Sequence, residues 1–92
     1  VIPFDNEGSD IYTIIEVDTR DRPGLLYDLT RALAAANVYI ASAVIATYGE
    51  QAVDSFYVKD MFGLKFHSEA KQKALEKKLR EAIERGAQRA GR

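Results

Sequence analysis

The chain contains no cysteine and no tryptophan, and only one histidine among its 92 residues. Without cysteine, a disulfide, a thiolate zinc site and a cysteine nucleophile are all excluded, and nothing indicates secretion. The single histidine, His67, has no second histidine to complete a metal site, and we interpret it as an ordinary loop residue. We therefore expect no catalytic residue, no metal, no cofactor and a cytoplasmic location.

Long hydrophobic runs are also missing. No apolar stretch approaches the roughly 20 residues that span a bilayer, and no signal peptide is visible, so we expect no membrane contact. The chain begins with Val1 rather than Met, which suggests that it is a piece of a longer protein. Apolar residues make up 47% of the sequence, which is enough for a core, and the length predicts a single domain, 1–92.

The net charge of −1 is unevenly distributed. Residues 1–60 carry four basic and ten acidic side chains, whereas residues 61–92 carry nine basic and four acidic ones. The basic part falls mostly in one expected helix with interspersed Lys and Glu, a pattern typical of a solvated face. The acidic part would repel phosphate, so we expect no nucleic-acid partner.

Hydrophobic periodicity predicts strands at about 1–5, 11–18, 38–48 and 52–59, and helices over 23–36 and 69–85. A bulge near Ala41–Ala43 would reconcile a change of apolar parity in the third strand. Gly49 suits the positive φ of a hairpin turn, and Asn37 suits the end of the first helix. Gly86 is expected to end the second helix.

This order of elements predicts an α+β, ferredoxin-like fold, with a four-stranded antiparallel sheet and two helices on one face. The last strand of a βαββαβ unit is missing, because residues 88–92 lack a β pattern. We expect the N-terminal strand, about 1–5, to fill that vacant edge. Residues 1–10 would then form the edge strand and its turn, 11–86 the core, and 87–92 a frayed tail.

The most distinctive stretch follows the strand at 11–18. Pro23 suits a first helical position, and the backbone at Gly24 can be approached closely because it has no Cβ. Free N–H groups at a helix start can accept a carboxylate. Such a turn can simply reverse the chain or can hold a small anion, and the residues alone leave both open.

We interpret two acidic residues, Asp21 in this turn and Asp54 in a later strand, as structural. Asp21 is interpreted as ordering the turn rather than binding a metal. Asp54 shares a face with Phe56 and Val58, but it lies near a strand start, where its carboxylate can reach backbone donors. We therefore interpret Asp54 as structural.

The other face of the sheet carries aromatic side chains, a feature shared with sheets that stack RNA bases. The signature motif of those RNA-binding domains is absent from the strand at 52–59. Self-association through this face is therefore favoured over RNA binding. Its residues are Tyr12, Ile14 and Tyr57.

Asp21-Arg22-Pro23-Gly24-Leu25-Leu26 after a strand resembles the signature of ACT domains, small regulatory modules that bind amino acids. The similarity continues through Asn37-Val38, Ile45-x-Thr47-x-Gly49 and Asp54-x-Phe56-x-Val58. A narrower resemblance covers nearly the whole chain, through Tyr27–Leu33, Ala46–Glu50, Phe56–Asp60 and Phe62–Lys65. It is to the C-terminal ACT domains of bacterial uridylyltransferase/uridylyl-removing enzymes, which act on the PII nitrogen-signalling protein.

The resemblance implies a ligand and a partner. In the ACT family two units pair, often side by side, and an amino acid sits at their interface against the first strand-to-helix loop. In the uridylyltransferase/uridylyl-removing enzymes that the chain resembles, glutamine is the signal. The implied ligand-binding residues are Asp21, Arg22, Pro23, Gly24, Leu25 and Leu26, with Asp21 meeting the ammonium and helix-start N–H groups the carboxylate. A partner ACT unit would close the site through Ser42, Ala43, Val44 and Ile45.

The implied function is a non-catalytic, glutamine-sensing regulatory module, because the catalytic domains of those enzymes are not in this chain. The alternative is an ACT-type module for dimerisation or protein docking that binds no ligand. One departure from the family pattern is the missing final strand.

Overall fold

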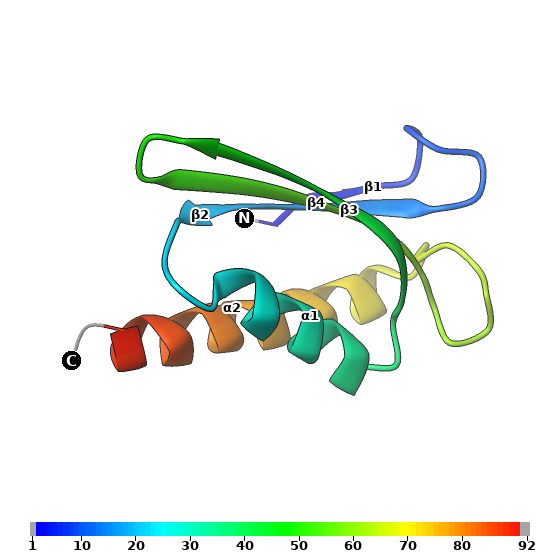
Figure 1. Ribbon diagram of the computed structural model, residues 1–92. Helices are drawn as coiled ribbons and strands as arrows, with labels where there is room; N and C mark the ends of the chain where they lie inside the picture. The colour runs from blue at the N-terminus through cyan, green and yellow to red at the C-terminus, as the bar shows by residue number, and fades with distance from the viewer. Residues whose placement is uncertain (1, 91–92) are drawn as a thin grey trace.

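The computed structural model describes residues 2–90, which form a four-stranded antiparallel sheet with both helices on one face (Figure 1). The order of strands in the sheet is β1-β2-β4-β3. This arrangement confirms the predicted ferredoxin-like architecture. The elements are β1 (Phe4–Asp5), β2 (Thr13–Arg20), α1 (Leu25–Ala35), β3 (Tyr39–Tyr48), β4 (Gln51–Lys59) and α2 (Glu69–Ala90).

The N-terminal segment fills the edge of the sheet beside β2, as predicted. Phe4 pairs with Ile15, and the backbone N–H of Glu16 donates to the carbonyl of Pro3 at 3.2 Å. Ile2 is buried in the core, although it precedes the paired residues. The segment thus covers backbone groups of β2 that would otherwise form an open edge. Val1, which we assigned to this strand, lies outside the described residues.

A small network of hydrogen bonds connects the turn after β1 to the segment that precedes α2. The hydroxyl of Thr13 is fully buried; it donates to Asn6 Oδ1 at 2.5 Å and accepts from the N–H of Phe66 at 2.8 Å. Asn6 Nδ2 donates in turn to the carbonyl of Phe66 at 2.9 Å. The hydroxyl of Thr13, both polar atoms of the half-buried Asn6 amide and the backbone groups of Phe66 therefore all have partners, as buried polar groups require.

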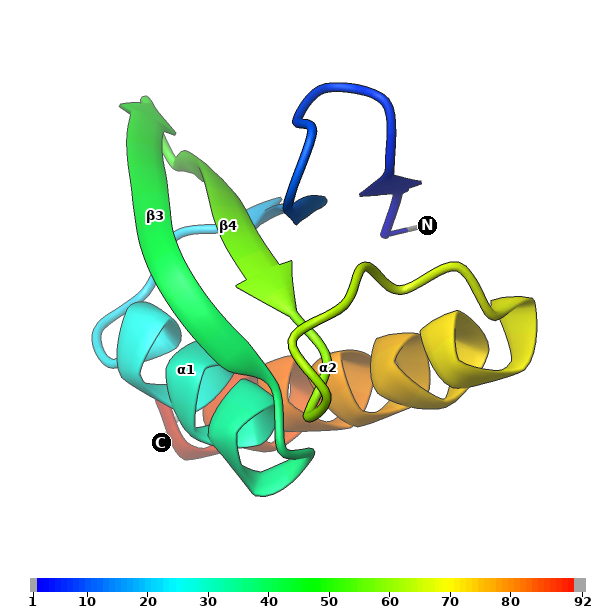
Figure 2. The ribbon, with the colours of Figure 1, turned by 90° about the vertical axis from the view of Figure 1, so that its right-hand side faces the viewer.

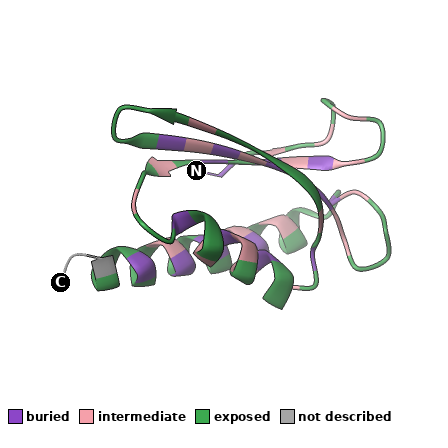
Figure 3. Ribbon diagram, in the orientation of Figure 1, coloured by how far each residue is buried: buried purple, intermediate pink, exposed green. Residues whose placement is uncertain are grey.

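The core lies between the inner face of the sheet and the two helices, where the buried residues gather (Figure 3). Apolar spacing of three and four residues along each helix produces this face. Leu26, although apolar, lies outside this face and is 39% exposed. The main contributors are Leu25, Leu29 and Leu33 of α1, Leu75 and Leu79 of α2, Ile15 and Val17 of β2, and Phe56 and Val58 of β4.

The hairpin β3–β4 turns tightly at Gly49, which has φ 61° as predicted. The expected bulge is also present, because the pairing register shifts between Ile40 and Ser42. Figure 2 shows β3 as the outermost strand, next to β4. Most of its ten residues are exposed, and its outer edge pairs with no other strand of the described residues.

The helix boundaries differ from the predictions at two glycines. Gly24 has φ 80°, which is incompatible with a helix, so α1 begins at Leu25 and not at Pro23. Gly86 does not end the second helix; α2 continues through it to Ala90. Residues 87–90 therefore belong to the helix, whereas 91–92 of the expected tail lie outside the described residues. The reason is spatial: Gly86 is buried against side chains of the β2–α1 loop and α1.

Candidate functional site

The loop between β2 and α1 borders a cavity of about 190 Å³. This is smaller than the roughly 300 Å³ at which drug-sized pockets begin, and suits a ligand of amino-acid size. Five of the six predicted ligand-binding residues line it, and Pro23 does not. The lining residues are Asp21, Arg22, Gly24, Leu25, Leu26 and Tyr27, with Ile45, Ala52 and Asp54 from the sheet.

The backbone fixes the shape of this loop at both ends. The N–H of Asp21 donates to the carbonyl of Glu50 at 2.7 Å, which ties the loop to the β3–β4 turn. At the other end, Gly24 adopts the left-handed conformation and its carbonyl accepts from the N–H of Asp28 at 2.9 Å. The N–H of Leu25 donates to the carbonyl of Arg22 at 3.2 Å, so among the described residues the N–H groups of Leu26 and Tyr27 are the first-turn donors left without an acceptor, and both residues line the cavity. These groups carry the positive end of the helix dipole.

The guanidinium of Arg22 is held by partners outside the cavity. Its Nη1 lies 2.9 Å from Asp28 Oδ2, and its Nη2 donates to the carbonyl of Ile83 on α2 at 3.4 Å. Arg89 approaches the same carboxylate at 3.1 Å. Arg22 thus joins the loop to α1 and α2, an arrangement that no local sequence signal indicated. That Arg22 also contacts a ligand remains a prediction.

Asp54 lies on β4 between Val17 of β2 and Ile45 of β3, and is 2% exposed. Its Oδ1 has no hydrogen-bond partner within the described residues, so our expectation that the carboxylate reaches backbone donors is wrong for this atom. Burial raises the pKa of the Asp54 carboxyl, and the negative charge of Asp21 raises it further. The sequence signal was its shared parity with Phe56, which places a carboxylate on the buried face.

The cavity therefore combines two kinds of polar group. Arg22 is engaged by Asp28, so the carboxylates of Asp21 and Asp54 have no other cation in the lining of the cavity. The start of α1 supplies N–H donors near Gly24. Carboxylates attract an ammonium and helix-start N–H groups attract a carboxylate, so the cavity matches both charges of an amino-acid zwitterion.

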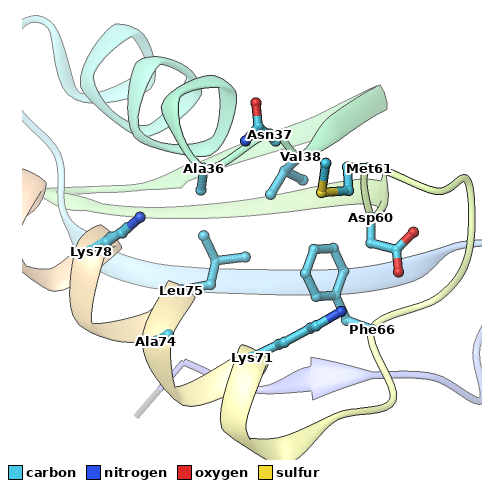
Figure 4. Close-up of a pocket in the computed structure, with 10 residues that line it drawn as sticks. All are labelled: Ala36, Asn37, Val38, Asp60, Met61, Phe66, Lys71, Ala74, Leu75 and Lys78. Atoms are coloured by element: carbon cyan, nitrogen blue, oxygen red, sulfur yellow. The ribbon is translucent and has the colours of Figure 1, made fainter.

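A second cavity of about 210 Å³ lies at the opposite end of α1, between that helix and α2 (Figure 4). Its walls are mostly apolar, with Phe66 and Leu75 drawn inside it and two lysines among its lining residues, Lys71 and Lys78. The carboxylate of Asp60, which also lines it, accepts from the N–H groups of Phe62 and Leu64 at 2.9 Å and so orders the connection. None of the predicted ligand-binding residues reaches this cavity.

The predicted interface residues lie on the outer strand, β3, and Ser42, Ala43, Val44 and Ile45 are all exposed. Val44 is 56% and Ile45 51% exposed, which is unusual for large apolar side chains in a strand. Ile45 also lines the cavity beside the loop. A strand that paired with β3 would therefore approach the mouth of the cavity.

Two further features concern the described part of the chain. Within residues 2–90, no three histidine or acidic side chains gather closely enough to hold a metal ion. No helix in this part of the chain combines the length and the apolar character needed to cross a membrane.

Comparison with known proteins gives the family. A family model described as "ACR9-like, ACT-like domain" matches residues 1–88. The chain belongs to the ACT-like domain family. This ACT-like domain also has close relatives among curated proteins, and the three described below carry the printed name bifunctional uridylyltransferase/uridylyl-removing enzyme.

The relative from Ruegeria pomeroyi is 86% identical over 89 residues, and the one from Cereibacter sphaeroides is 81% identical over 89. Each match covers 97% of the ACT-like domain and 10% of the relative. The relative from Azospirillum brasilense is 56% identical over 80 residues, which are 87% of the domain and 9% of the relative. The chain thus spans about a tenth of the curated relatives it matches, and no solved structure matches it.

Proposed function

We propose that this ACT-like domain is the glutamine-sensing regulatory module of a cytoplasmic bifunctional uridylyltransferase/uridylyl-removing enzyme that acts on the PII nitrogen-regulatory protein. Identity of 81–86% to proteins of that name supports the parent enzyme. The sensing role is carried by one observation: the cavity at the β2–α1 loop brings carboxylates and helix-start N–H groups together. The chain itself performs no chemistry in this proposal.

In this proposal the ligand binds as a zwitterion. Its ammonium is held by cavity carboxylates, and its carboxylate by N–H groups at the start of α1. Its side chain points towards Ile45 and the exposed edge of β3, where a partner ACT unit closes the site. Binding then favours the paired form of the domain and, through it, removal of uridylyl groups over their addition.

Titration of the isotopically labelled chain with L-glutamine tests the sensing role. We expect amide shifts concentrated at Asp21–Leu26 and Asp54, at millimolar ligand or below. L-Glutamate should have smaller effects, because its second carboxylate adds negative charge to a cavity that already holds two carboxylates. Unchanged spectra for every amino acid tested, in monomer and dimer alike, would rule out amino-acid sensing by this domain.

A second candidate, a dimerisation or docking module without ligand, is favoured by the exposed β3 edge. An open edge with apolar side chains is a template for pairing with another strand. Sedimentation equilibrium should show that the wild-type chain is a dimer and the Val44→Lys variant a monomer. Ala35→Lys, at an exposed position of α1, is the charge-matched control and should remain a dimer. A dimer that gives no ligand response would favour this second function over sensing.

A further inference from the structure

Thr13 and Asp54 are both buried polar residues of the core, but they differ in how fully their side chains are hydrogen-bonded. The hydroxyl of Thr13 both donates and accepts a hydrogen bond. In contrast, Asp54 Oδ1 is buried and has no partner within the described residues. Leaving a buried polar atom unpaired is costly, more so for a carboxylate, so such a group calls for a physical reason.

The position of Asp54 supplies one. The residue lines the loop cavity while only 2% of it is exposed, so it lies at the floor of the cavity rather than at its rim. Its strand neighbours in register, Val17 and Ile45, are apolar and offer its carboxylate no side-chain donor.

The charges around the cavity leave Asp54 uncompensated. The charged or titratable side chains that line it are Asp21, Arg22, Tyr27 and Asp54. Arg22 is the one cation among them, and it is engaged by Asp28 at 2.9 Å and by the carbonyl of Ile83. The floor is therefore negative, and the complementary ligand group is a small cation that donates several hydrogen bonds.

We propose that Asp54 binds the α-ammonium group of the amino-acid ligand, with Asp21 as a second acceptor at the rim of the cavity. The inference rests on the proposed sensing function and names the residue that makes it specific for amino acids. An ammonium has three donors in a compact group, and the carboxylates of Asp54 and Asp21 together offer four acceptor oxygens. A Ca²⁺ or Mg²⁺ ion would require about six oxygen ligands, more than this floor supplies.

The titration behaviour of Asp54 agrees with this role. Burial raises the pKa of its carboxyl, and Asp21 adds to the shift. A bound ammonium would lower that pKa again, because an opposite charge favours the ionised form. Ligand binding is therefore expected to strengthen as the pH rises through the pKa of the unliganded Asp54 carboxyl.

The test compares the wild-type 92-residue chain with Asp54→Asn, and with Asp10→Asn as a control that removes an exposed carboxylate from the turn before β2. Calorimetric titration with L-glutamine should show affinity about 10- to 100-fold weaker for Asp54→Asn and unchanged for Asp10→Asn. Urea unfolding without ligand should show Asp54→Asn at least as stable as wild type, since the substitution removes an unpaired buried charge.

A ligand lacking the ammonium gives an independent measurement on the unaltered chain. Glutaramate, the des-amino analogue of glutamine, should bind wild type at least about 10-fold more weakly than glutamine, and should bind Asp54→Asn and wild type alike.

Three outcomes would overturn the proposal: equal affinity of Asp54→Asn and wild type for glutamine, equal affinity of wild type for glutamine and glutaramate, or clear destabilisation of unliganded Asp54→Asn, which would mark Asp54 as structural. A wild-type chain that responds to no amino acid would overturn the sensing function and this inference together. The first two outcomes leave amino-acid sensing intact, so the two failures are distinguishable.

Discussion

Arg22 Nη1 lies 2.9 Å from Asp28 Oδ2, and the two side chains are only 10% and 13% exposed. The pair sits where the β2–α1 loop, the first turns of α1 and the last third of α2 meet, because Arg22 also donates to Ile83 and Arg89 approaches Asp28. One ion pair thus fixes the loop that borders the candidate ligand cavity.

Asp28→Ala should destabilise the domain by about 2–4 kcal/mol, because it leaves the buried guanidinium of Arg22 without its anion. Arg89→Ala is the matched comparison: Arg89 is 64% exposed, so its contact with Asp28 should contribute no more than about 1 kcal/mol. Urea unfolding of both variants measures the difference. Equal losses for the two variants would contradict the assignment of Arg22–Asp28 as the dominant pair.

Gly86→Ala should also destabilise the domain, although alanine favours a helix by about 1 kcal/mol. A Cβ at this position would overlap the guanidinium of Arg22 and the carboxylate of Asp28. We expect a net loss of about 1–3 kcal/mol by urea unfolding, as for overpacked sites. Gln88→Ala, at an exposed position of the same helix, should change stability by less than about 0.5 kcal/mol. A Gly86→Ala variant more stable than wild type would show that the ion pair readily moves aside.

The bulge in β3, the β3–β4 hairpin and Gly86 show where prediction from sequence succeeds and where it fails. The change of parity around Ala41–Ala43 and the glycine at position 49 predicted the bulge and the hairpin correctly, because both are local conformational preferences. Gly86 looked like a helix end for an equally local reason. Its true neighbours come from the region of Arg22, whose contact with Ile83 spans 61 residues of sequence, so no local pattern revealed them.

Some features of the candidate site could likewise be predicted from the sequence, and others could not. Loop residues such as Asp21 and Gly24 were identified by resemblance, and the structure places both beside a cavity. The alternation of β4 put Asp54 on the buried face, yet the sequence could not tell whether its carboxylate would find donors there. That depends on how α1 sits over the sheet, which is a property of the packed molecule.

Two acidic residues should show opposite effects of pH on stability. Burial raises the pKa of Asp54 above its usual 3.8, so ionising it costs stability at neutral pH. Asp54→Asn should then be the more stable protein near pH 7. Its advantage should shrink as the pH falls through the raised pKa towards 3.8, because the native state takes up the proton first.

For Glu76→Gln we expect a stability difference of the opposite sign to that of Asp54→Asn. The hydrogen bond from Arg80, at 2.9 Å, lowers the pKa of Glu76 below its usual 4.5. Its stabilisation is present above 4.5 and is lost as the pH falls through the lowered pKa, so wild type should exceed Glu76→Gln only at the higher pH. Unfolding curves from pH 3 to 7 measure both differences; gaps of the same sign would contradict one of the two assignments.

Deleting residues 1–5 should destabilise the domain and promote its aggregation. The deletion removes buried Ile2, the pairing of Phe4 with Ile15, and the cover over the edge of β2. Loss of Ile2 alone is expected to cost about 2–4 kcal/mol. Thermal unfolding and light scattering measure the two effects.

Pro3→Ala, at an exposed residue whose carbonyl still bonds to Glu16, is the matched control and should resemble wild type. A truncated chain with unchanged stability and solubility would mean that the N-terminal strand is not needed to complete the sheet.

The strand order β1-β2-β4-β3 has a kinetic consequence. The hairpin β3–β4 is local and can form in microseconds, whereas β2 must find β4 across α1 and β3. Such distant pairings require loop closure before any contact forms, which slows them. The cavity draws its walls from the β2–α1 loop, β3 and β4, so it cannot exist before that slow pairing. We therefore expect the ligand site to be among the last parts of the molecule to assemble, and a bound ligand to slow unfolding rather than speed folding.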